Sequence, residues 1–177
     1  VGRGLDDLGV YWFEEPIAPE DYDGYKELKN KLQTNIAGGE AEFTKWGWKH
    51  LIQNRCVDIA QPEVCGLGGI TEYLKVVALA QANFIPVVNH VWGSALSIAV
   101  NLHLLTAMPD MPGGLFPFKP MLEFDTTANN IFISDLAEEK FDIFNQVKNN
   151  NGFVKALEGH GIGLNPSKDF IKKYEIK

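Results

Sequence analysis

Short apolar segments that end in a polar side chain alternate along this chain with segments of helical periodicity. The apolar segments are rich in β-branched and aromatic residues and span residues 10–16, 34–40, 57–63, 85–90 and 121–124. The helical patterns place apolar residues three and four positions apart, over residues 21–32, 43–54, 70–83 and 94–108. Strands that alternate with helices predict βαβ units around a parallel sheet, and therefore an α/β fold.

Local signals support this alternation. The segment 85–88 is apolar at successive residues, as burial on both faces of a parallel sheet requires. Ser94 precedes the last helical pattern and is predicted to cap it.

The polar side chains at the strand ends recur at intervals of one βα unit. Glu14, Glu40, Glu63 and His90 follow one another 26, 23 and 27 residues apart. In a parallel barrel every strand delivers its last side chain to the same rim, where the sites of such barrels are built. Three carboxylates and an imidazole gathered there need a compensating cation, because like charges disfavour joint ionisation. Glu14 and Glu40 are therefore predicted to bind a hard divalent metal, and oxygen ligation favours Mg²⁺ over Zn²⁺.

Composition narrows the class of partner. The 177 residues are 45% hydrophobic and 22% charged, which is ordinary for a globular protein. Sixteen basic residues against 23 acidic ones give a net charge of −7, and their scatter leaves no footprint for nucleic acid or an anionic membrane. Cys56 and Cys65 form no metal-spaced pair and are predicted to be buried thiols in a reducing, cytoplasmic compartment. A small molecule or a cation is the expected partner.

The alternation stops after residue 125. Turn signals at residues 128–130 and 149–152 and a glycine-rich run at 159–166 predict short strands or loops. We therefore expect residues 1–125 to form the catalytic α/β part and residues 126–177 to form a C-terminal extension.

Five motifs in order resemble the C-terminal part of the mandelate racemase/muconate-lactonising branch of the enolase superfamily. They are WFEEP at 12–16, GGE at 38–40, QPE at 61–63 with GGITE at 68–72, NHVWGS at 89–94 and LEFD at 122–125. The most similar subgroup is that of mandelate racemase, which includes acid-sugar dehydratases. The resemblance implies the later part of a (β/α)8 TIM-type barrel, about its fourth to eighth strands. It also implies that the C-terminal extension packs on the barrel or on a capping domain that lies outside this chain.

The resemblance further implies roles for individual residues. Glu14 and Glu40 would ligate Mg²⁺. His90 would act as general base or acid, oriented by Glu63, where the family usually has an Asp. Glu123 would hydrogen-bond the substrate carboxylate as it becomes an enediolate.

Trp92 and Glu15 each lie one or two positions from a predicted site residue. Trp92 is predicted either to bind substrate at the mouth of the pocket or only to pack. Glu15 is predicted to point to the other side of its strand and not to ligate the metal. In the family a third metal ligand and a second base come from earlier strands.

The activity implied is a Mg²⁺-dependent abstraction of the proton α to a carboxylate, through a metal-stabilised enediolate. Dehydration of a sugar acid is the favoured outcome, and racemisation, epimerisation or cycloisomerisation is the alternative. A metal-dependent hydrolase would use several His ligands, and only His90 ends a strand. An alternative without catalysis is that the chain is a fragment that needs its missing strands or a partner chain, because an open barrel exposes unpaired strand edges. Homo-oligomerisation is also expected.

Overall fold

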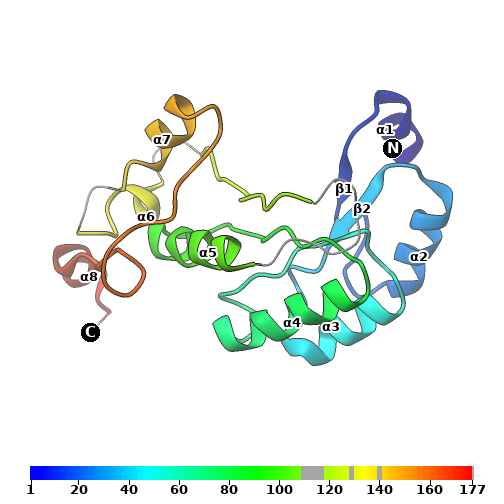
Figure 1. Ribbon diagram of the computed structural model, residues 1–177, viewed down its shortest axis with the longest axis horizontal. Coiled ribbons are helices and arrows are strands. Elements are labelled where there is room, and N and C mark those ends of the chain that lie inside the picture. Colours follow the sequence, from blue (N-terminus) through cyan, green and yellow to red (C-terminus); the bar gives the residue numbers. More distant parts are fainter. Residues whose placement is uncertain (109–117, 128–129, 139–140, 177) are drawn as a thin grey trace. The chain divides into compact units, whose positions relative to one another are not determined.

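The computed structural model describes residues 1–108, 118–127, 130–138 and 141–176 (Figure 1). The described residues form two compact units: residues 1–90 with 118–121, and residues 91–108 with 122–176. Each unit is described below by itself. The division into a catalytic part and a C-terminal extension at residue 125 stays a prediction.

The first unit contains a parallel sheet in the order β1-β2-β3. Its strands are β1 (Trp12–Glu14), β2 (Asn35–Gly38) and β3 (Ile59–Ala60). Glu14 pairs with Ala37, and Ala37 pairs with Ile59. The parallel pairing that the alternation predicts is confirmed for these strands.

The fourth predicted strand, residues 85–90, is reduced to a single parallel bridge. Val87 pairs with Ala60, whose N–H donates to Pro86 O at 2.9 Å and whose carbonyl accepts from Val88 N at 2.9 Å. This segment therefore continues the order of the sheet beyond β3 by two hydrogen bonds.

The helices of the first unit are α1 (Gly2–Leu8), α2 (Tyr22–Lys31), α3 (Thr44–Gln53) and α4 (Ile70–Ala82). The last three are confirmed to within a residue or two of the predicted ends, and the Asp21 carboxylate caps α2 by accepting from Gly24 N at 2.9 Å. Helix α1 lies outside the predicted helices. Its Asp6 carboxylate accepts from the N–H and hydroxyl groups of Thr34, both at 2.7 Å, and these bonds lower the pKa of Asp6.

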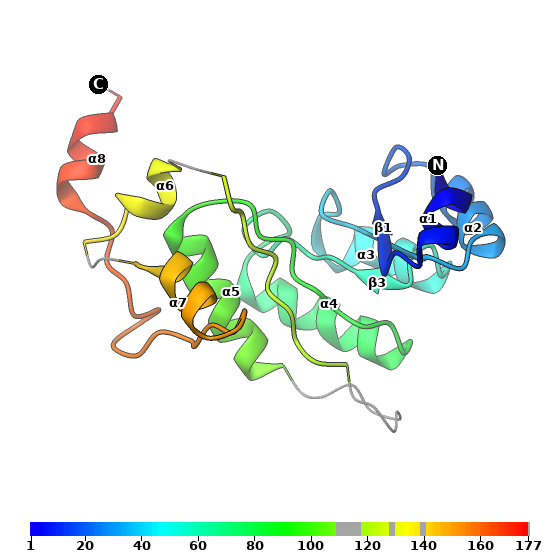
Figure 2. The same ribbon diagram turned by 90° about the horizontal axis from the view of Figure 1, so that it is seen from above.

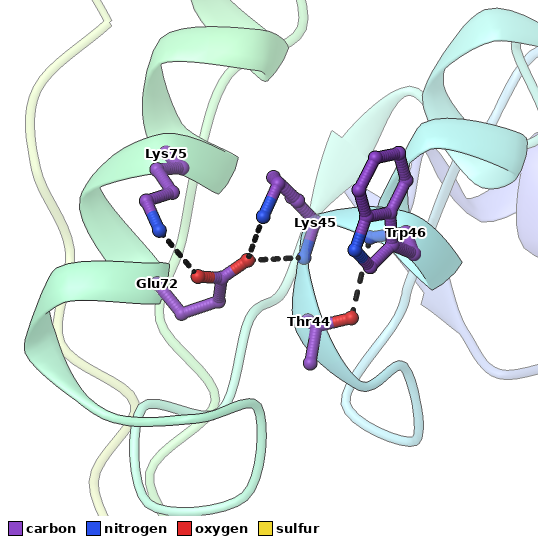
Figure 3. A network of polar contacts seen from close by, with 5 residues as sticks. All are labelled: Thr44, Lys45, Trp46, Glu72 and Lys75. Atoms are coloured by element: carbon purple, nitrogen blue, oxygen red, sulfur yellow. Dashed lines mark hydrogen bonds and ion pairs between the residues drawn. The ribbon is translucent and has the colours of Figure 1, made fainter.

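Helices α3 and α4 lie side by side and are joined through one carboxylate (Figures 1 and 3). Oε1 of Glu72 accepts from Lys45 N at 3.0 Å and from Lys45 Nζ at 3.3 Å. Its Oε2 accepts from Lys75 Nζ at 2.8 Å. The Lys75 and Lys45 bonds together lower the pKa of Glu72 to about 2. The link fixes the start of α3 against the first turns of α4.

Close packing between β2 and α3 requires a glycine beside the predicted metal ligand. Gly39 has φ 113°, and a Cβ there would lie 2.4 Å from Cη2 of Trp48, a fully buried side chain of α3. Any other residue at this position would be strained by the backbone conformation and would collide with the indole. The chain consequently leaves β2 along a defined path that ends at Glu40.

The second unit contains α5 (Ala95–Ala107), α6 (Ile131–Ser134), α7 (Ile143–Asn149) and α8 (Lys168–Tyr174). Ser94 caps α5, as predicted, because its Oγ accepts from Ser97 N at 3.4 Å. Helix α6 lies beside α5 (Figures 1 and 2). The buried side chains of α5, α6 and α7 form one apolar cluster that includes Ile98, Leu102, Ile133 and Ile143.

The expectation of short strands or loops after residue 125 is wrong for these three short helices. Each begins at a side chain that accepts from a backbone N–H two or three residues later: Asn130, Asp142 and Ser167. Such caps are readable signals that outweigh the turn signals nearby. The predicted turn at 149–152 is confirmed, with φ 52° at Asn151 and 86° at Gly152. Residues 128 and 129 of the other turn signal lie outside the described residues.

The two cysteines differ. Cys56 is buried, as predicted, and Cys65 is exposed, so the prediction is wrong for Cys65. Cys65 lies in the turn that follows the end of β3, where the chain passes over the edge of the sheet. Among the described residues, no helix has the length and apolar character needed to cross a membrane.

Candidate active site

Polar side chains gather where the parallel segments of the first unit end. Glu14 is the last residue of β1, and Glu40 follows β2 by two residues. Glu63 follows β3 by three residues, and His90 follows the bridge at Val87 by three. Because the carboxyl ends of parallel strands meet at one edge of the sheet, these four side chains come from four adjacent segments to one region.

His90 lies at the centre of this group, between two carboxylates. Its Nδ1 is 2.9 Å from Glu63 Oε2, and its Nε2 is 3.1 Å from Glu40 Oε2. The imidazole side chain is only 12% exposed. A neutral ring carries one N–H and can donate to only one carboxylate, so both contacts are hydrogen bonds only when both nitrogens are protonated.

Glu63 is held from two directions. Its Oε2 faces His90, and its Oε1 accepts from Cys65 N at 2.8 Å. Burial opposes ionisation of this carboxyl, but the hydrogen bonds from His90 and Cys65 outweigh it, so the pKa of Glu63 is lowered. Glu63 therefore remains an anion that can orient the imidazole. The longer side chain of Glu, compared with the Asp usual in the family, still reaches Nδ1.

Glu14 is also fixed by donors. Its Oε2 accepts from the indole Nε1 of Trp12 at 3.1 Å and from Nε2 of Gln61 at 2.8 Å. The sequence motifs include both donors without assigning a role to either. The signal that singles out Gln61 is an amide side chain directly after an apolar strand, at a position that the structure buries completely.

Glu15 is predicted to point away from Glu14, and its Cγ lies 3.6 Å from where a Cβ of Gly38 would stand, beside the Tyr25 ring of α2. Its φ of 35° is left-handed, whereas the alternation of side chains applies to extended backbone. Its pKa is raised by burial first and then by the negative charge of Glu40, with a smaller contribution from Glu14. The Oε1 atom of Glu15 is buried without a hydrogen-bond partner. This carboxyl therefore lies within the field of the predicted metal ligands.

The negative charges of the acids at the strand ends favour the binding of a cation. Within the described part of the chain, neither Lys nor Arg forms an ion pair with the acids at positions 14, 15, 40 and 63, and the only positive partner is the imidazole of His90. Carboxylate oxygens are the ligands that Mg²⁺ prefers. The described residues contain no set of three His, Cys, Asp or Glu side chains that would hold a metal unaided. Glu14 and Glu40 fit as two oxygen donors of a larger ligand set.

Glu123 and Trp92 belong to the second unit. Oε2 of Glu123 accepts from Val91 N at 2.7 Å. Trp92 is 74% exposed. Asp125 accepts from Thr127 N at 2.7 Å and from Asn130 Nδ2 at 3.1 Å, and these hydrogen bonds lower its pKa.

Comparison with known proteins places the chain in a family. Residues 1–170 match the model of the family described as enolase C-terminal domain-like. The chain belongs to this family. The enolase-superfamily chain thus has the α/β fold predicted for it and corresponds to the C-terminal, barrel part of the mandelate racemase/muconate-lactonising proteins.

Curated relatives and a solved structure narrow the branch. D-galactarolactone cycloisomerase of Agrobacterium fabrum is 33% identical over 99% of this chain and 45% of its own length. Arabinonate dehydratase of Saccharolobus solfataricus is 28% identical over 100% of this chain and 43% of its own. The crystal structure of 3,6-anhydro-D-galactonate cycloisomerase from Zobellia galactanivorans is 32% identical over 99% of this chain and 46% of that one, with a TM-score of 0.81. The chain spans about half the length of the curated relatives it matches.

Proposed function

We propose that this chain carries the general base or acid, its orienting carboxylate and two metal ligands of an enzyme that removes the proton α to the carboxylate of a sugar acid. The observation that supports this most is His90, held by Glu63 on one ring nitrogen and facing Glu40 with the other. Dehydration is the favoured outcome. The relatives are about twice as long as this chain. The proposed activity is therefore that of the full-length protein.

His90 supports proton transfer by its orientation. A neutral imidazole that donates Nδ1–H to Glu63 keeps the lone pair of Nε2 for the α proton of the substrate. Nε2 must then be released from Glu40, which it faces at 3.1 Å. In a dehydration the electron pair left on the α carbon expels the β hydroxyl, which departs as water after taking a proton from the imidazolium. The ionised Glu63 stabilises that imidazolium.

Glu14 and Glu40 would hold Mg²⁺ with ligands from outside the described residues. The bound cation would supply positive charge opposite the carboxylate oxygens of the substrate, where negative charge develops as the enediolate forms. We assign to Glu123 a hydrogen bond to the same carboxylate, on the resemblance of its motif. Glu123 must be protonated to donate that bond, and a neighbouring substrate carboxylate favours the protonated form. Trp92 is assigned to substrate binding rather than to packing alone, and its exposure of 74% supports that choice.

Cycloisomerisation is the second candidate. The relative in Agrobacterium fabrum and the solved structure from Zobellia galactanivorans are both named cycloisomerases of sugar-acid derivatives, and both are more than 30% identical to this chain. Both reactions begin with the same proton abstraction, so His90 and the metal ligands serve either one. The outcomes differ in the fate of the enediolate.

The function is tested with the full-length protein and a panel of sugar acids and their lactones in D₂O. Proton NMR should show loss of the α-hydrogen signal or formation of a dehydrated or cyclised product, and chelation of divalent cations should abolish both. Absence of exchange with every member of the panel in the presence of Mg²⁺ would refute the proposal.

The chain alone raises a separate possibility, that of a fragment without activity. Within the described residues β1 pairs only with β2, so its other edge offers unpaired backbone groups to a missing strand, to a capping domain or to a second copy. Size-exclusion chromatography with light scattering, with and without Mg²⁺, separates these cases. A stable monomer of residues 1–177 that binds the metal would contradict the need for further strands.

A further inference from the structure

A buried amide next to Glu14 has a role beyond packing. Gln61 follows β3 directly, and its side chain is among the largest that are fully enclosed, at 1% exposure. Nε2 of this amide donates to Glu14 Oε2 at 2.8 Å, whereas its Oε1 is buried without a hydrogen-bond partner. One end of the amide is therefore engaged with a predicted metal ligand, and the other end contributes nothing to the hydrogen bonding of the core.

The backbone allows this contact to cross an intervening strand. In the order β1-β2-β3, Gln61 and Glu14 are separated by β2, which carries Ala37 and Gly38 at this level. Ala37 pairs with Glu14, and its small side chain leaves space for the amide to reach across on that face of the sheet. Gln61 N also donates to Gly38 O at 3.0 Å, so the backbone that carries the amide is anchored to β2. The orientation of the amide follows from chemistry, because an ionised carboxylate only accepts and must face the nitrogen.

A second donor binds the same oxygen. Trp12 is two residues before Glu14 on β1 and therefore lies on the same side of the strand. Its indole Nε1 donates to Glu14 Oε2 at 3.1 Å. Two N–H groups thus converge on Oε2, and no hydrogen bond within the described residues engages Oε1. The carboxylate is held by one oxygen and presents the other.

We infer that Gln61 and Trp12 are positioning residues for the cation: together they hold Glu14 by Oε2 and leave Oε1 as its single metal-binding oxygen. This inference rests on the proposed function. It differs from a packing role, because a leucine of similar size would fill the space of Gln61 and would remove the unpartnered carbonyl oxygen, whose burial is destabilising. The role of the amide is therefore its hydrogen bond to Glu14.

The test measures divalent cation binding as well as turnover. Gln61→Leu, Trp12→Phe and the control Gln53→Leu, an exposed residue at the end of α3, are made in the full-length protein. Calorimetric Mg²⁺ titration and Mn²⁺ paramagnetic resonance report affinity, and thermal unfolding without metal reports the fold. Loss of groups that orient a metal ligand commonly weakens metal binding 10 to 100-fold, so we expect about that loss for Gln61→Leu and a smaller one for Trp12→Phe. Gln53→Leu should bind as the wild type does.

A packing role gives the opposite pattern. Gln61→Leu would then unfold at the same or a higher temperature without metal and bind Mg²⁺ as tightly as the wild type, which would overturn the inference. If Gln61→Leu does not fold, Trp12→Phe decides, and unchanged Mg²⁺ and Mn²⁺ affinity in that variant would overturn it. If the wild type exchanges the α-hydrogen but binds cations no more tightly than the two variants do, only this inference is refuted. A wild-type protein that binds no divalent cation refutes the proposed function.

Discussion

Two groups of carboxylates in the first unit differ in what neutralises them. Glu72, between α3 and α4, is surrounded by the N–H and Nζ groups of Lys45 and by Lys75, and its pKa is lowered to about 2 (Figure 3). Glu15, at the end of β1, has no such partner within the described residues, and its pKa is raised by burial and by Glu40. The pKa values of these two carboxyls are therefore shifted in opposite directions.

The difference separates a structural acid from a functional one. A carboxylate with ammonium partners is satisfied in the folded chain and contributes to its stability. Glu15 has no ammonium partner among the described residues and its pKa is raised, so its ionisation opposes folding unless a ligand neutralises it. The predictions that follow test this distinction, and they run from the largest expected effect to the smallest.

Replacing His90 with Asn removes the one positive partner that Glu40 and Glu63 have among the described residues. Exchange of the α-hydrogen in D₂O should fall by about 10² to 10⁴-fold, the usual contribution of general acid–base catalysis. Proton NMR of the full-length protein measures it. His50→Asn, at an exposed position of α3, is the matched control. Exchange that survives in the His90 variant would show that the group owes its arrangement to something other than proton transfer.

Tyr73 connects the helix layer to the segment that carries His90. Its hydroxyl donates to Asn89 Oδ1 at 2.5 Å, and both side chains are fully buried. Tyr73→Phe withdraws a donor from a buried amide, so the free energy of unfolding should fall by about 1–3 kcal/mol. Chemical denaturation measures this. Unchanged stability would mean that the strand end is held by packing alone.

Neutralising Glu15 should stabilise the metal-free protein at neutral pH. The pKa of Glu15 is raised in the folded state, so its ionisation favours the unfolded chain. Stability from this group is complete below its unfolded pKa and is lost as pH rises through the folded one. Glu15→Gln should therefore raise the Tm at pH 7 and change it little at pH values below the ordinary Glu value.

Added Mg²⁺ is the second arm of the Glu15 experiment. Bound Mg²⁺ should reduce the gain in Tm that Glu15→Gln produces, because the cation neutralises the same negative charges. A Tm that falls at pH 7 for Glu15→Gln would place this acid with Glu72, among the structural ones.

Glu72→Gln should have the opposite sign and the smallest size. Its folded pKa of about 2 lies below the ordinary 4.5, so its contribution is present above pH 4.5 and disappears as pH falls toward 2. The variant should unfold at a slightly lower temperature at pH 7 and should match the wild type near pH 2. Raising the salt from about 0.05 to about 0.5 M should shrink the difference, because exposed ion pairs are screened. A difference that salt leaves unchanged would point to lost hydrogen bonds rather than charge.

Periodicity and caps were sufficient to predict much of the fold. The helices α2, α3, α4 and α5 and the cap Ser94 follow from local patterns, because the apolar face and the first-turn hydrogen bonds are short-range properties. The short helices α6, α7 and α8 were missed, since four to seven residues carry too little periodicity to outweigh turn residues. The strands proved shorter than their apolar runs, as pairing depends on neighbours far along the chain.

The candidate site divides in the same way. An acid or an imidazole recurs in the sequence at each strand end, and parallel strands bring these ends to one edge of the sheet. This pattern was sufficient to predict Glu14, Glu40, Glu63 and His90 as site residues. Two further features depend on contacts between segments that are far apart in the sequence. Gln61 holds Glu14 across β2. Glu15, whose own φ is left-handed, lies in the electrostatic field of Glu40. Such contacts depend on side-chain directions and on the space left by small neighbours, which arise only when the folded strands lie against one another.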